Sequence, residues 1–217
     1  MGLKITQTRK SKVSYHQPFQ ITGFHSCDRQ IGLQVLNGEI SLAPSDNKWD
    51  WLGTGIYFWE QNPARALEYA IESAQGKQKN KFPITSPFVI GAIIELGNCL
   101  NLLEPKSLQI VKEAHDGLER AIRESGEKMP VNKGPNRELD CAVIRFLHGI
   151  RNSVGDPRFD TIRSSFQEGK MLYPGSNFTS RLHIEICVLN AELIKGYFLP
   201  IPIDEFNPYL SKNPRNN

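Results

Sequence analysis

Cysteine is scarce in this sequence, and its spacing gives no sign of a metal site. The 217 residues include 4 cysteines, with no CxxC pair and no histidine at the spacing of a zinc ligand. We therefore expect free thiols and no bound metal. The chain also lacks internal repeats, and no GxGxxG motif follows a predicted strand, which argues against a solenoid and against a doubly wound dinucleotide-binding fold.

Long apolar segments are absent as well. No stretch approaches the length of a bilayer span, and residues 1–15 are polar and basic without the apolar core of a signal peptide. These features predict a cytoplasmic protein that makes no membrane contact. The net charge of +3 is too small to indicate a nucleic-acid partner by itself.

The length and the hydrophobic content of 39% suffice for one buried core. We expect one folded domain over residues 15–202, present as a monomer. A basic N-terminal arm (1–14) precedes it and a C-terminal tail (203–217) follows it.

Five apolar patterns predict β-strands, at Ile21–His25, Gly53–Phe58, Phe88–Leu96, His183–Leu189 and Ile194–Leu199. The last two are close enough in the sequence to pair across Asn190–Leu193. Alternation along the fourth places Glu185 on the face opposite Ile184 and Ile186.

Four helical patterns lie between these strands. They are expected to begin at Cys27–Asp28, Asn62–Pro63, Ser107 and Glu138, and to end near Asn37–Gly38, Gly76, Glu124 and Leu147. The second helix should pack one apolar face on the core, and this face is formed by Leu67, Ala70, Ile71 and Ala74. Its charged residues should face outward, namely Arg65, Glu68 and Glu72. The mixture predicts an α+β domain with a mostly antiparallel sheet.

Two short segments resemble a known family. Gly23-Phe24-His25-Ser26 ends the first predicted strand, and Gly53-Thr54-Gly55-Ile56-Tyr57-Phe58 precedes a helix with Ala66 and Tyr69. Together they resemble the poly-ADP-ribose-polymerase-like branch of the ADP-ribosyltransferases. In that branch a first strand supplies a histidine, a G-x-G-I-Y-F strand a tyrosine and a late strand a glutamate. His25, Tyr57 and Glu185 occupy these places in that order.

The resemblance implies a split, strongly bent β-sandwich of mostly antiparallel strands with flanking helices and an NAD+ cleft between its halves. It implies that NAD+ is a co-substrate. Glu185 would stabilise the oxocarbenium-like ribose of the transition state, His25 would bind a ribose hydroxyl, and Tyr57 would stack on nicotinamide.

The resemblance also assigns Ser26, Gly55 and Tyr69 to NAD+ binding. Tyr69 is expected either to form a second aromatic wall or to pack as an ordinary helix residue. Ser26 stands where the family usually has a glycine, whose backbone holds the nicotinamide carboxamide. A side chain at this position restricts close approach of the backbone.

The segment 159–178 is expected to be a flexible loop that selects the acceptor, with four candidate residues along it: Asp160, Arg163, Glu168 and Tyr173. Glu168 also competes with Glu185 for the role of catalytic carboxylate. The alternative is a set of ordinary turns with solvated charges.

These features favour an NAD+-dependent mono-ADP-ribosyltransferase acting on a protein or nucleic acid such as RNA. The resemblance extends to bacterial toxins and defence effectors, some of which an antitoxin holds in check. NAD+ glycohydrolysis and a non-catalytic NAD+- or RNA-binding module remain open, and Ser26 favours the latter. A Cys/His hydrolase using Cys27 with His25, or Cys141 with His148, has little support because neither pair has an apparent orienting carboxamide.

Overall fold

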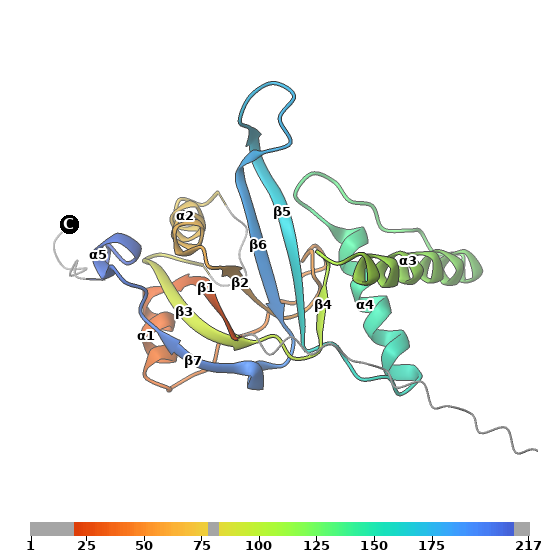
Figure 1. The fold of residues 1–217 in the computed structure, drawn as a ribbon, viewed down its shortest axis with the longest axis horizontal. Helices are drawn as coiled ribbons and strands as arrows, with labels where there is room; N and C mark the ends of the chain where they lie inside the picture. The colour runs from red at the N-terminus through yellow and green to blue at the C-terminus, as the bar shows by residue number, and fades with distance from the viewer. Residues whose placement is uncertain (1–19, 78–82, 211–217) are drawn as a thin grey trace, which may run out of the picture.

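Seven strands form one open sheet in the computed structural model, which describes residues 20–77 and 83–210 (Figure 1). The strands are β1 (Gln20–Asp28), β2 (Ile56–Glu60), β3 (Pro87–Glu95), β4 (Cys99–Asn101), β5 (Thr161–Met171), β6 (Thr179–Val188) and β7 (Ile194–Phe198). Their order is β4-β5-β6-β2-β1-β3-β7, and every pair is antiparallel except β4 with β5. The predicted α+β class with a mostly antiparallel sheet is confirmed.

Helices cover both faces of this sheet. They are α1 (Arg29–Leu36), α2 (Pro63–Ala74), α3 (Pro105–Ser125), α4 (Glu138–Ser153), the 3-10 helix η1 (Ala191–Leu193) and α5 (Ile203–Phe206). On one face, α3 and α4 pack over β5 and α2 packs over β1. α1 lies on the other face, where Phe58, Ile90 and Ile186 are fully buried. Within 20–77 and 83–210, no helix is long and apolar enough to cross a membrane.

The predicted starts of α1 and α2 are confirmed by their caps, whereas α3 begins at Pro105, two residues before the predicted Ser107. The side chains of Asp28 and Asn62 each accept a backbone N–H of the following turn at 3.0 Å. Pro63 takes the first position of α2, where no N–H is needed. α1 stops before Asn37, and Gly38 follows with φ of 73°.

The strand β7 does not pair with β6, so the predicted hairpin between them is wrong. β7 pairs with β3 instead and forms the edge of the sheet. The reason is that β6 already has a neighbour on each side, β2 and β5. The short helix η1 therefore leads the chain away from β6.

The predicted flexible loop at 159–178 is largely a strand. β5 pairs with β6 from Thr161 to Met171, with a register shift between Glu168 and Met171 close to the turn that joins the two strands. This long hairpin projects from the body of the protein (Figure 1). Ile162 and Phe166 anchor β5 in the core. The polar residues between them hide the strand pattern in the sequence.

The orientation of α2 also differs from the prediction. Small residues, Ala66 and Ala70, lie against the sheet and are fully buried, whereas Ala74 is exposed. Arg65 is buried rather than solvated. The helix is thus rotated about its axis, because alanines allow it to approach the sheet more closely than Leu67 would.

The C-terminal tail is shorter than expected. Asn207 is 2% exposed, and its side chain accepts from the Val89 N–H at 2.8 Å and donates to the Val89 carbonyl at 3.0 Å. These bonds attach the segment after β7 to strand β3. The basic arm expected at 1–14 lies outside the described residues.

We expect Asn207→Ala to lower the free energy of unfolding by roughly 1–3 kcal/mol, because both buried main-chain groups of Val89 lose their partner. Urea titration measures this. Gln109→Ala, on the exposed side of α3, is the control and should change stability by less than about 0.5 kcal/mol. Equal stability of Asn207→Ala and the parent would show that the tail is not anchored there.

Candidate functional site

The three residues expected to be catalytic lie on neighbouring strands. His25 is on β1, Tyr57 on β2 and Glu185 on β6, and these strands are consecutive in the order β6-β2-β1. Tyr57 pairs with Cys187 and Glu185 with Trp59. Since side chains alternate along a strand, Tyr57 and Glu185 share one face of the sheet.

The pairing between β1 and β2 is unusually short. It comprises Gly23 with Glu60 and Phe24 with Trp59. At the next position the ring of His25 supplies the hydrogen bond instead of the main chain, and its Nδ1 lies 2.8 Å from the carbonyl oxygen of Tyr57. A side chain thus replaces the main-chain ladder at the point where the two strands part.

The chemistry of His25 follows from this bond. Because a carbonyl oxygen only accepts, Nδ1 must carry the hydrogen, which leaves Nε2 of the neutral ring as an acceptor. Burial lowers the pKa of His25, although the hydrogen bond to Tyr57 opposes this shift. Among the residues that the structure describes, none bonds to Nε2. The half-buried ring is suited to accept a hydrogen bond from a ligand hydroxyl at neutral pH.

The ring of His25 lies on the opposite face from Tyr57 and Glu185. His25 follows Phe24, which pairs with Trp59, so its side chain points to the same face as that of Phe58. The centroids of these two rings are 5.6 Å apart. In the described part of the chain, no hydrogen bond joins His25 to Glu185. The three residues are therefore neighbours in the sheet but do not form one contiguous cluster.

The hydroxyl of Tyr57 is used within the protein. It donates to the Gly53 carbonyl at 2.6 Å and accepts from the Leu52 N–H at 3.1 Å. Burial raises the pKa of Tyr57 well above its ordinary value. The hydroxyl thereby holds the turn that leads into β2, and the half-buried ring packs against the core cluster that contains Ile162 and Cys187.

The other residues assigned to NAD+ binding also have structural roles. The Ser26 hydroxyl is buried and donates to the Ala66 carbonyl, which ties β1 to α2. A Cβ atom at Gly55 would lie 2.4 Å from the Cys187 Sγ, so only glycine fits beside β6. The Tyr69 ring packs on Trp59 with centroids 5.2 Å apart.

Glu185 has a buried partner that the sequence analysis did not identify as functional. One carboxylate oxygen, Oε1, lies 3.0 Å from Nε2 of His183, whose side chain is 1% exposed. The other ring nitrogen, Nδ1, lies 2.7 Å from the Arg181 carbonyl. Burial lowers the pKa of His183, but the hydrogen bond to Glu185 and its charge outweigh this effect and raise the pKa above the ordinary value. The sequence signal that could have revealed this contact is strand alternation, which puts positions 183 and 185 on the same face of β6.

The four residues expected to line an acceptor loop are dispersed along β5 and its ends. Asp160 lies immediately before β5, and its side chain accepts a hydrogen bond from the Asn98 N–H at 2.8 Å. Arg163 forms a two-pronged ion pair with Glu60, at 2.5 and 2.9 Å. Tyr173 is 57% exposed at the turn. They do not form one surface, which corrects the expected grouping.

Glu168, the fourth of these residues, belongs to a charged network between α2 and the β5–β6 hairpin. It accepts from Arg65 at 2.8 Å. On β6, Arg181 forms ion pairs with Glu68 and Glu72. The α2 residues that were expected to point to solvent therefore connect α2 to the hairpin, and Glu168 is paired with Arg65.

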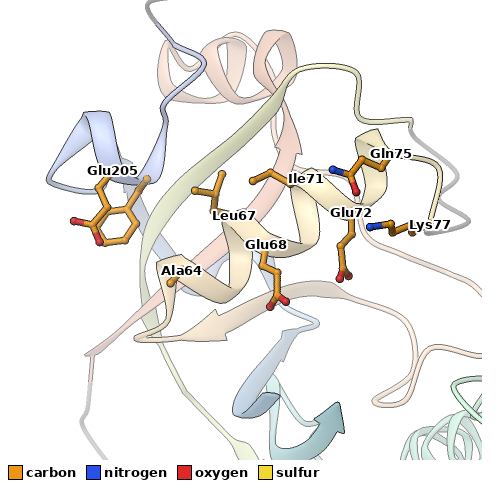
Figure 2. A pocket seen from close by; sticks show the side chains of 9 residues that line it. Ala64, Leu67, Glu68, Ile71, Glu72, Gln75, Lys77 and Glu205 are labelled. Atoms are coloured by element: carbon orange, nitrogen blue, oxygen red, sulfur yellow. The ribbon is translucent and has the colours of Figure 1, made fainter. Parts of the chain in front are cut away.

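A shallow hollow of about 390 Å³ lies between α2 and α5. Figure 2 shows Leu67 and Ile71 on one side of α2 and Glu68 and Glu72 on the other. None of His25, Tyr57 or Glu185 lines the hollow, so it is separate from the candidate site. Across the described ranges, no group of three or more histidine, cysteine or acidic side chains could hold a metal ion.

The chain is similar to an uncharacterized protein of Methanocaldococcus jannaschii, MJ0359. The two are 23% identical over 210 residues, which cover 88% of this chain and 93% of that protein. The name of this relative states no activity. No family model and no solved structure matches the chain.

Proposed function

We propose that the chain is an NAD+-dependent mono-ADP-ribosyltransferase that releases nicotinamide and modifies a protein or RNA acceptor. The observation that carries the proposal is the strand order β6-β2-β1, because the strands that contain Glu185, Tyr57 and His25 are consecutive neighbours in the sheet. These residue types also occur in the chain order that the family resemblance requires.

In this proposal NAD+ lies across the point where β1 and β2 part. The proposal requires the ligand to contact His25 on one face of the sheet and Glu185 on the other. The described strands form one open sheet, and the proposal places the NAD+ site where the short β1–β2 pairing ends. His25 Nε2 accepts a ribose hydroxyl, and the Tyr57 ring stacks on nicotinamide.

The reaction breaks the bond between C1′ of the nicotinamide-side ribose and the ring nitrogen. Nicotinamide leaves with the bonding electrons and becomes neutral, while the ribose gains oxocarbenium character. Glu185 stabilises this charge through the 2′-hydroxyl, whose hydrogen bond strengthens as the sugar becomes electron-poor. The acceptor then attacks C1′ and loses its proton.

A second candidate is an NAD+- or RNA-binding module without catalysis. It is favoured by the Ser26 hydroxyl, which fills the space between β1 and α2 and donates to Ala66. The Tyr57 hydroxyl is likewise occupied by the turn at Gly53. Release of nicotinamide by the purified protein separates the two candidates.

We expect His25→Ala to weaken NAD+ binding at least about tenfold, because a buried ribose hydroxyl loses its acceptor. Calorimetry measures the Kd, and circular dichroism confirms the fold. His115→Ala, on a half-exposed side of α3, is the matched control. Parental affinity in folded His25→Ala protein would remove His25 from the site.

We expect Glu185→Gln to bind NAD+ while releasing nicotinamide on the order of a hundred- to a thousandfold more slowly, since it loses the charge that stabilises the transition state. Glu168→Gln is the matched control, because Glu168 already pairs with Arg65. That variant should keep most of the release rate. If Glu168→Gln abolishes release and Glu185→Gln does not, the catalytic carboxylate is Glu168.

A further inference from the structure

We infer that His183 is a positioning residue that holds the Glu185 carboxylate for catalysis, and that the site is active only while this imidazole carries a proton. The inference rests on the proposed function and adds a means of regulation to it. It starts from a geometric fact: the ring of His183 touches two groups that can only accept hydrogen bonds.

Those two groups require a doubly protonated ring. The Arg181 carbonyl lies 2.7 Å from Nδ1, and the Glu185 carboxylate lies 3.0 Å from Nε2. A neutral imidazole has a single N–H, so it can satisfy only one of these acceptors. The imidazolium satisfies both at once, and its positive charge fixes one oxygen of Glu185. The second oxygen, Oε2, remains for a substrate hydroxyl.

The surroundings keep His183 in place. Its side chain is buried beside the Phe166 ring of β5, with centroids 5.9 Å apart. Because the ring is buried and bonded to the main chain at Arg181, it has little rotational freedom, and its bond to Oε1 restricts the rotamers of Glu185. Preorganisation of this kind is what a catalytic carboxylate needs, since a displacement of about 1 Å can cost about a hundredfold in rate.

The neighbouring charges allow a proton on the ring. Glu185 on β6 and Glu168 on β5 both favour the charged form. Arg181 on β6 is neutralised by Glu68 and Glu72 of α2, and Arg65 of α2 is paired with Glu168. Because the pKa of His183 is raised, the charged ring persists above the usual range of histidine and is lost as the pH rises through that higher pKa.

The pH profile of nicotinamide release tests the inference. The parent should lose activity on the alkaline side as His183 loses its proton. His183→Gln can donate one N–H to Glu185 but cannot carry charge, so its kcat should fall by up to about a hundredfold with little change in KM, and the alkaline limb due to His183 should disappear. His115→Gln is the control and should retain the parental profile. A parental kcat and an unchanged profile in folded His183→Gln protein would overturn the inference.

Nuclear magnetic resonance titration gives a test that needs no activity. The pKa of His183 should fall in Glu185→Gln, because the ring loses its anionic partner. It should stay near the parental value in Glu104→Gln, an exposed carboxylate before α3. An unchanged pKa in Glu185→Gln would contradict the pairing even if His183→Gln fails to fold. If the pairing holds but the parent releases no nicotinamide, the proposed function and the catalytic role of His183 both fail, and only the contact survives.

Discussion

The parting of β1 from β2 is the constraint on which the candidate site depends. Main-chain pairing between these strands ends at Phe24 and Trp59, and the His25 ring then bonds to the Tyr57 carbonyl. This bond satisfies a backbone acceptor that a longer ladder would have paired. It also fixes the tautomer of His25, so one contact both ends the β1–β2 pairing and leaves Nε2 of the ring as an acceptor.

A second set of interactions fixes the other side of the site. Ion pairs from Arg65 and Arg181 connect α2 to the β5–β6 hairpin, and His183 holds Glu185 on the same hairpin. Part-buried pairs of this kind depend strongly on geometry, because each desolvated charge must keep its partner. The hairpin that carries Glu185 is therefore attached to the helix that covers β1, although the two are far apart in the sequence.

The sequence predicted elements whose signals are local. Asp28 and Asn62 marked the starts of α1 and α2, and the continuous apolar run of β3 was clear. Partners far apart in the sequence could not be predicted in this way. The occupied edges of β6 exclude β7, and the polar residues between Ile162 and Phe166 conceal β5. For the site, the pattern identified the strands of His25, Tyr57 and Glu185 but not the contact between His183 and Glu185, because a hydrogen bond within one face has no sequence signal beyond alternation.

The most direct test of the central claim is incubation of the purified protein with NAD+ labelled in its ADP-ribose portion, with and without whole-cell lysate. Nicotinamide release is followed together with the label in protein, RNA, DNA and free ADP-ribose. The proposed transferase should release nicotinamide and place label in a macromolecular fraction when lysate is present. Label found only in free ADP-ribose would indicate glycohydrolysis instead. Intact NAD+ under both conditions would contradict an enzymatic role for the site where β1 and β2 part.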